Sequence, residues 1–238
     1  MNTGETQAFY QAPKAAPRQY RERDLPAQEL SLALVQQRAP ERLLAEQAIT
    51  QKFERAFGAH LTHFLPDLLR LNVAHELGAV AGIRAANCNS LFLEQYLDRP
   101  VEQAIAGAFM MPVDRDQVVE VGNLAANVPG HACTLFAVLA TVLSHAGYRW
   151  VACTATPQVA AMLKRLNFSA QTICSADPSR LDGGLENWGN YYSTRPQVIA
   201  GDVHLAAHQA ATSPEFAAQI RQLHQPIMQA ASSLRSAS

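Results

Sequence analysis

The sequence is poor in cysteine and in long apolar runs, and it carries almost no net charge. Its four cysteines lie far apart and form no Cys-x-x-Cys pair, so we expect reduced thiols rather than a disulfide framework. A formal net charge of −1 argues against a general nucleic-acid binder. No apolar run reaches the roughly 18 residues that span a bilayer, and residues 1–30 lack the apolar core of a secretion signal. We therefore expect a cytoplasmic protein with no transmembrane segment and no nucleic-acid partner.

Metal ligands and paired nucleophiles are scarce too. His60 and His63 are three residues apart, but no acidic or cysteine ligand lies close by, so we expect no metal site. Cys153 follows an apolar strand pattern, and a cysteine nucleophile would need a paired histidine. A buried structural thiol is the simpler interpretation of Cys153.

The chain is long enough for one sizeable core. It has 238 residues, 48% of them hydrophobic. We expect one domain over residues 29–203, between a flexible N-terminal tail at 1–28 and a helical C-terminal tail at 204–238. The tail segment from Ser213 has a capping-box-like start, one apolar face and a kink expected at Pro226. It could pack on the body, pair with a second subunit in a homodimer, or lie on a membrane surface.

The order of predicted elements indicates an α/β fold. Residues 117–168 read as strand, turn, uncharged helix, strand and short helix, a βαβα unit with a right-handed crossover. Apolar periodicity, proline and glycine predict four earlier elements: a strand at 29–36, a helix from Pro40 to Gly58, a hairpin of 65–73 and 79–86, and a helix from Pro100 to about 109. After the unit we expect a strand at 170–174 and a closing strand drawn from 188–192 and 195–201.

Glu120 is the first candidate for chemistry, because it lies mid-strand among valines. Burying a carboxylate without a partner is costly, so we expect Glu120 to bind something or to react. Apolar neighbours would raise its pKa, which suits a general base. Arg84, on a half-buried strand, needs an anion. That anion is either a substrate carboxylate or Glu120 itself, in a structural salt bridge.

This order of elements resembles the GCN5-related N-acyltransferase domain, a mixed sheet with splayed central parallel strands flanked by helices. In such domains the splay admits the pantetheine arm of a thioester donor. The resemblance implies substrate-binding positions at Asn123 on one strand and at Cys153 and Thr154 on the other. It also implies that backbone N–H groups of the following turn hold the donor's phosphates, here at Gly130, His131 and Ala132.

The donor is expected to be acyl-CoA or the phosphopantetheine arm of an acyl carrier protein, and no cofactor is expected to stay bound. The turn has one glycine and lacks the Gln/Arg-x-x-Gly-x-Gly/Ala pattern of most acetyl-CoA enzymes. This departure favours a carrier protein or a long acyl chain over acetyl-CoA.

Five motifs carry a closer resemblance, to the bacterial thermostable hemolysin family, over about residues 30–203. They are Phe64-Leu-Pro-Asp-Leu-Leu69, Gly82-Ile-Arg-Ala85, Leu91-Phe-Leu-Glu-Gln-Tyr-Leu-Asp98, Glu120-Val-Gly-Asn-Leu-Ala125 and Trp188-Gly-Asn-Tyr-Tyr192. The chain is more distantly similar to acyl-homoserine-lactone synthases, in which a strand begins Glu-x-Ser-Arg-Phe. Here Gly-Asn replaces Ser-Arg, which points away from a homoserine-type acceptor.

Together these patterns predict an acyltransferase that moves a fatty or other acyl group to a small amine or amino-acid acceptor. Glu120 is the predicted base, and Tyr191 or Tyr192 is the predicted proton donor to the departing thiolate, with packing as the alternative role for each tyrosine. Glu94 and Asp98 are candidates to hold a cationic acceptor, unless they are solvated charges. Two other functions remain open: a membrane-active hemolysin that uses its C-terminal segment, and a non-catalytic acyl-thioester-binding protein.

Overall fold

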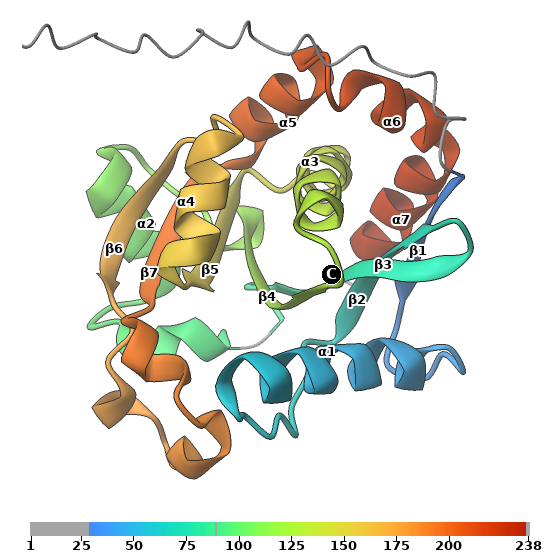
Figure 1. Cartoon of the computed structure of the whole chain (residues 1–238). Helices are drawn as coiled ribbons and strands as arrows, with labels where there is room; N and C mark the ends of the chain where they lie inside the picture. The colour runs from blue at the N-terminus through green and yellow to red at the C-terminus, as the bar shows by residue number, and fades with distance from the viewer. Residues whose placement is uncertain (1–28, 89, 237–238) are drawn as a thin grey trace, which may run out of the picture.

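A seven-stranded mixed sheet runs through the molecule (Figure 1). The structure, a computed structural model, describes residues 29–88 and 90–236, so the expected N-terminal tail lies outside the described residues. The strand order in the sheet is β1-β2-β3-β4-β5-β7-β6. The neighbouring strands β4 and β5 are parallel. The strands are β1 (Leu30–Val35), β2 (Asp67–Val73), β3 (Glu76–Ala85), β4 (Val118–Ala126), β5 (Trp150–Ala155), β6 (Ala170–Ser175) and β7 (Gln197–Asp202).

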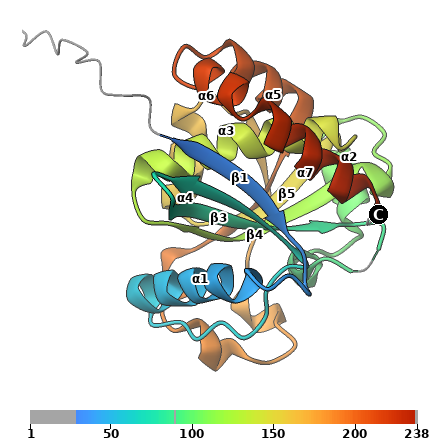
Figure 2. The same cartoon turned by 90° about the vertical axis from the view of Figure 1, so that its right-hand side faces the viewer.

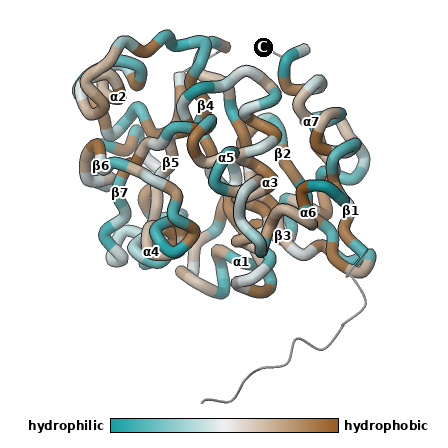
Figure 3. The backbone as a smooth tube through the Cα atoms, turned by 90° about the horizontal axis from the view of Figure 1, so that it is seen from above, coloured by the Kyte–Doolittle hydropathy of each residue, from teal (hydrophilic) through white to brown (hydrophobic). Residues whose placement is uncertain are grey.

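Helices cover both faces of the sheet (Figure 2). They are α1 (Arg42–Phe57), α2 (Val101–Phe109), α3 (Pro129–His145), α4 (Pro157–Arg165), α5 (Val203–Thr212), α6 (Ala217–Gln222) and α7 (His224–Ser236). The uncharged α3 packs on β2, β3 and β4 in the largest core cluster, and α7 adds its apolar face to the same cluster. The opposite face carries α1 and α2. Figure 3 shows the apolar residues concentrated along the strands.

Most predicted elements are confirmed. The expected first strand, the α1 helix, the hairpin, α2, the βαβα unit and β6 all form, with shifts of a few residues at their ends. α1 ends where Gly58 adopts a positive φ of 63°, as its position in the sequence predicts. Ala74 and His75, with φ of 50° and 67°, make the two-residue turn of the β2–β3 hairpin.

The two parallel strands part soon after they pair. Their register runs from Val118 opposite Trp150 to Glu120 opposite Ala152, although β4 continues to Ala126. Beyond Glu120 the pairing of β3 with β4 shifts register, and Asn123 has a positive φ of 49°. This bulge turns β4 away from β5. The predicted splay is therefore confirmed.

Two predictions near the C-terminal end were wrong. The closing strand is Gln197–Asp202 alone, because residues 185–194 form the short 3₁₀ turns η4 (Leu185–Trp188) and η5 (Tyr191–Thr194). The single kinked helix from Ser213 is replaced by α6 and α7, and Pro226 lies in the first turn of α7, where proline fits without a kink. Three roles were expected for this segment, and α7 shows the first of them, packing on the body of the protein. It buries Ile227, Ala230, Ala231 and Leu234 in the largest core cluster.

No helix within the described ranges combines the length and the apolar character that crossing a bilayer requires.

Residues 185–194, here called the aromatic loop, are tied to the end of α1. Asn190 N donates to Phe57 O at 2.8 Å, and His60 N donates to Asn187 O at 2.7 Å. Between them Gly189 has a φ of 51°, and a Cβ built there would lie 2.1 Å from Phe57 O. Only glycine fits this contact.

We predict that Gly189→Ala destabilises the protein by more than the roughly 1–3 kcal/mol of backbone strain alone, because the new methyl group meets backbone that cannot move aside. Gly147→Ala is the matched control, since Gly147 has a φ of 93° and nothing within 4 Å of its Cβ position. Urea unfolding followed by circular dichroism measures both losses. Equal losses of unfolding free energy in the two variants would show that the aromatic loop is not in close contact with the end of α1.

Candidate active site

Glu120 lies at the fork between β4 and β5 and is 4% exposed. Its Oε2 accepts a hydrogen bond from Phe92 N at 2.9 Å, and its Oε1 accepts one from Leu93 N at 3.0 Å. Both donors belong to the first turn of the 3₁₀ helix η1 (Phe92–Tyr96), whose leading N–H groups have no partner within the helix. Burial raises the pKa of Glu120, against the lowering effect of these two bonds and of nearby Arg84.

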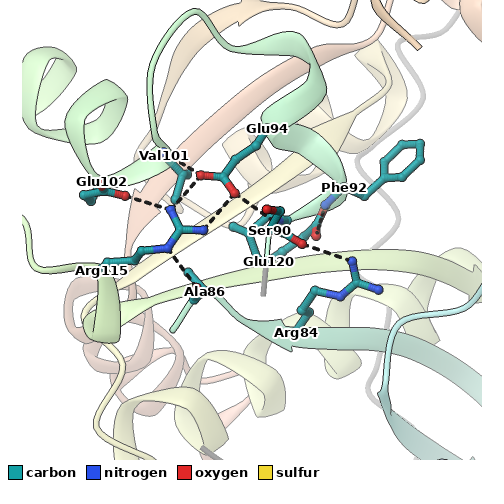
Figure 4. A network of polar contacts seen from close by, with 10 residues as sticks. Arg84, Ala86, Ser90, Phe92, Glu94, Val101, Glu102, Arg115 and Glu120 are labelled. Carbon is teal, nitrogen blue, oxygen red and sulfur yellow. Dashed lines mark hydrogen bonds and ion pairs between the residues drawn. The ribbon is translucent and has the colours of Figure 1, made fainter. Parts of the chain in front are cut away.

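Arg84 stands directly opposite Glu120 in the β3–β4 register. The salt bridge between them, which was the structural alternative for both residues, does not form, because the Glu120 oxygens are turned to η1 (Figure 4). The hydrogen bond found for the Arg84 side chain is a long one of 3.5 Å, from Nη1 to Ser90 O. Within residues 29–88 and 90–236, the half-buried guanidinium has no ion pair and can receive an external anion.

Glu94 belongs to an internal ion-pair network. Its Oε1 lies 2.6 Å from Arg115 Nη1, and Leu91 N and Val101 N donate to its carboxylate at 2.8 and 3.0 Å. Arg115 also contacts Glu102 and donates to Ala86 O at 2.9 Å (Figure 4). The bond to Arg115 is the main cause that lowers the pKa of Glu94 to about 2. This carboxylate thus fixes the start of both η1 and α2.

Asp98 also has an internal cation, since its Oδ1 lies 2.7 Å from Arg180 Nη1. The Asp98 side chain is 87% exposed, whereas that of Glu94 is 15% exposed. A cationic acceptor would have to displace Arg115 from Glu94 or Arg180 from Asp98. The acceptor role predicted for both acids stays a prediction.

Tyr191 and Tyr192 lie in a cluster of aromatic side chains on the same face of the sheet as α1. This aromatic cluster consists of Phe53, Phe57, Phe92, Tyr96, Trp188, Tyr191 and Tyr192, joined by ring contacts with centroid separations between 5.1 and 6.5 Å. The Tyr191 hydroxyl donates to Thr154 O on β5 at 3.4 Å. The Tyr192 hydroxyl lies 2.5 Å from that of Tyr96. Burial raises the pKa of both Tyr191 and Tyr192.

The two edges of the fork hold the other predicted substrate-binding residues. Burial, with a smaller effect from the charge of Glu120, raises the pKa of the Cys153 thiol to about 12. A thiol held neutral in this way is a poor nucleophile, which suits the structural interpretation. On β4, Asn123 Oδ1 accepts a hydrogen bond from Leu65 N at 2.8 Å, so this side chain holds the bulge in place.

The predicted phosphate turn opens α3. Gly130, His131 and Ala132 lie in its first turn, where the helix dipole favours an anion, although His131 N already donates to Val128 O at 3.0 Å. Gly130 has nothing within 4 Å of its Cβ position, so the turn is open there. His131 Nδ1 is buried and has no hydrogen-bond partner among the described residues. The same described ranges contain no group of three or more side chains suited to hold a metal ion.

The sequence patterns missed Tyr96, Arg115 and the N–H groups of Phe92 and Leu93. Tyr96, Phe92 and Leu93 all belong to the motif Leu91–Asp98, so the motif itself was the available signal. What it did not reveal is that this segment folds back onto Glu120.

The order of elements predicted the fold of the GCN5-related N-acyltransferases, a mixed sheet whose central parallel strands part, and the structure has this sheet. The chain belongs to the thermostable hemolysin family, whose model matches residues 35–207. No curated protein matches it in sequence.

Three solved structures share the fold at low identity. FeeM, an N-acyl amino acid synthase from uncultured soil microbes, has a TM-score of 0.52 and 14% identity over 77% of this chain and 95% of its own. The acyl-homoserine-lactone synthase LasI has a TM-score of 0.54 and 10% identity over 76% and 95%. TofI, in a ternary complex with an inhibitor and MTA, has a TM-score of 0.50 and 14% identity over 75% and 96%.

We predict that Glu94 makes the protein sensitive to acid. Its pKa falls from 4.5 to about 2 on folding, so its contribution is complete above about pH 4.5 and is lost as the pH falls toward 2. The urea midpoint of the wild type should therefore drop across this window, and Glu94→Gln should flatten the drop while lowering stability at neutral pH. Glu215→Gln, at an exposed position, is the control. An unchanged pH slope in Glu94→Gln would contradict the network.

Proposed function

We propose that the protein is an N-acyltransferase that moves an acyl group from a phosphopantetheine thioester to the amino group of a small acceptor. The observation that carries this proposal is the parting of β4 from β5 immediately after Glu120. A slot with free backbone edges can bind an amide-bearing arm as an added strand. A buried carboxylate at the inner end of that slot lies where an amine would have to lose its proton.

The donor is proposed to enter along the parted strands. Its amide groups would bond the backbone beyond Glu120 on β4 and near Thr154 on β5, and its phosphates would approach the open first turn of α3. Both acyl-CoA and acyl carrier protein present this arm. The single glycine of the turn, in place of a fuller glycine-rich pattern, favours a carrier protein or a long acyl chain.

Glu120 is proposed as the general base. The acceptor nitrogen attacks the thioester carbonyl carbon, a C–N bond forms, the C–S bond breaks, and the amine proton passes to the carboxylate directly or through a water. Each carboxylate oxygen keeps a second lone pair beside its bond to η1. The raised pKa of Glu120 makes its ionised form a stronger base than an exposed glutamate.

An amino acid is the acceptor that fits Arg84. The Arg84 guanidinium has no ion pair to a described carboxylate and stands opposite Glu120, so it can hold the acceptor's carboxylate while the amine meets the base. The similarity in fold to FeeM, an N-acyl amino acid synthase, supports this assignment. The apolar rings of the aromatic cluster offer a wall for the acyl chain on the same side of the sheet.

The haemolysis in the family name is proposed to come from the product. An N-acyl amino acid joins an apolar chain to a carboxylate, which is the chemistry of a surfactant. Direct membrane action by the C-terminal segment fits less well, because α7 uses its apolar face in the core. Residence in the cytoplasm stays a prediction from the sequence.

We predict that wild-type protein incubated with long-chain acyl-CoA or acyl carrier protein and a pool of amino acids and polyamines yields an acylated amine, detected by mass spectrometry. Glu120→Gln should lower the rate by about 10²–10⁴-fold, the usual contribution of a general base. The wild-type rate should rise with pH through a pKa above 4.5, since burial raises that of Glu120.

Glu120→Asp is the control for this experiment, because it keeps the carboxylate and its hydrogen bonds to η1 partly in place. Circular dichroism checks that both variants fold. If no donor gives a product and the protein lyses liposomes by itself, the membrane-active alternative replaces the transferase. If acyl-thioester binds without turnover and Glu120→Gln binds equally well, the protein is a non-catalytic binder.

We predict that Arg84→Gln raises KM for the amino-acid acceptor by about 10–100-fold, the loss expected for a charge-assisted hydrogen bond. The matching amine without a carboxylate should show no such change. Steady-state kinetics with both acceptors makes the comparison. Equal losses with both would mean that Arg84 acts on Glu120 and not on the acceptor.

A further inference from the structure

Tyr96 ends η1 and makes a short hydrogen bond to one of the two candidate proton donors. It is 2% exposed, and its hydroxyl lies 2.5 Å from the hydroxyl of Tyr192. Among the described residues this is the hydrogen bond that the Tyr96 hydroxyl makes. Its ring also contacts Phe92 and Tyr192, with centroids 6.1 and 6.5 Å apart.

Either hydroxyl could donate in this hydrogen bond, and burial favours Tyr96 as the donor. A hydroxyl has one proton to donate and two lone pairs, and a buried O–H that donates to nothing is costly. Tyr96 is almost fully buried, so it donates to the oxygen of the half-buried Tyr192. The Tyr192 proton then has no acceptor among the hydrogen bonds of the described residues. In agreement, the bond from Tyr96 lowers the pKa of Tyr192, although burial raises it by more.

Tyr191 is in a different position. Its hydroxyl proton is held by the backbone carbonyl of Thr154, and the residue is 6% exposed. A proton bound to a backbone carbonyl is less available than one without an acceptor among the described residues. Of the two candidate acids, Tyr192 is the one with a proton to give.

We propose that Tyr96 is a positioning residue that makes Tyr192 the proton donor to the departing thiolate. This rests on the acyl transfer proposed above. As the C–S bond breaks, its electron pair stays on sulfur and takes the Tyr192 proton. The Tyr192 phenolate that remains accepts the hydrogen bond of Tyr96 and regains a proton from solvent.

The ionisable groups around the pair come from several elements. Glu120 on β4 and Tyr191 on η5 act electrostatically on Tyr96, and Cys174 Sγ on β6 donates to Tyr96 O at 3.5 Å. An open groove of about 720 Å³ also borders Tyr96, and its charged lining residues are Asp98, Arg99, Asp177 and Arg180. Because these groups complicate a simple pH profile, the decisive test varies the leaving group.

The test compares two donors with the same acyl chain, an acyl-pantetheine and an acyl-thiophenol. The aryl thiolate is a weaker base and leaves without a proton, so it needs no acid. With acyl-pantetheine we expect Tyr192→Phe to lower kcat by about 100-fold and Tyr96→Phe by about tenfold. With acyl-thiophenol both should stay within about twofold of wild type. The double variant should match Tyr192→Phe alone, because Tyr96 acts through Tyr192.

Tyr148→Phe is the matched control, since Tyr148 is a tyrosine 4% exposed in the core on the α3 side. It should leave the ratio of the two donors unchanged. Equal losses with both donors in Tyr96→Phe, or additive losses in the double variant, would overturn the proposal and leave acyl transfer standing.

If the wild type transfers the acyl group from neither donor, the proposed function fails. A second measurement still tests whether Tyr96 donates a hydrogen bond to Tyr192. In protein labelled with ¹³C-tyrosine, the Tyr192 resonance, assigned with Tyr192→Phe, should titrate at a higher pH in Tyr96→Phe than in wild type. An unchanged Tyr192 titration would overturn the assignment of Tyr96 as its hydrogen-bond donor.

Discussion

The contact between the Glu120 carboxylate and the first turn of η1 is the interaction on which this face of the molecule depends. Phe92 N and Leu93 N have no partners within their short helix, and Glu120 is a carboxylate 4% exposed. Each group alone would carry a desolvation penalty, and together they satisfy one another. The contact also sets η1 across the sheet, so that Phe92 and Tyr96 meet the aromatic loop. One carboxylate thereby joins the fork between the strands to the tyrosine pair.

Two glutamates near η1 have opposite electrostatic environments. Arg115 holds Glu94 ionised down to a pKa of about 2, whereas burial raises the pKa of Glu120, for which no described cation forms an ion pair. Glu94 is therefore suited to a permanent charge that caps η1 and α2. Glu120 is suited to gain and lose a proton. A pair of carboxylates whose pKa values are pushed apart in this way separates a structural role from a chemical one.

Local patterns were enough to predict most strands and helices, because apolar periodicity, Pro100 and Gly58 each act within a few residues. Glu120 stood out for the same reason, as an acid among valines. The fork was expected from the resemblance of the element order to the GCN5-related fold. The aromatic loop was missed because its 3₁₀ turns have no apolar period. The site contacts themselves are long-range: Arg115 meets Glu94 across 21 positions and Tyr96 meets Tyr192 across 96. Only tertiary folding brings these pairs together.

The departure from the synthase pattern has a physical explanation in the bulge of β4. Gly122 stands opposite Gly82, and Leu65 lies over both, with its Cδ1 3.2 Å from the Cβ position of Gly122. A larger residue at 122 would push Leu65 away. Asn123 tolerates the positive φ of 49° better than most residues, and its side chain accepts the N–H of Leu65. Leu65, which packs over the two glycines and donates to Asn123, therefore holds β4 in the bulge that turns it away from β5. The dipeptide that departs from the synthase pattern is also the one at which β4 turns away from β5.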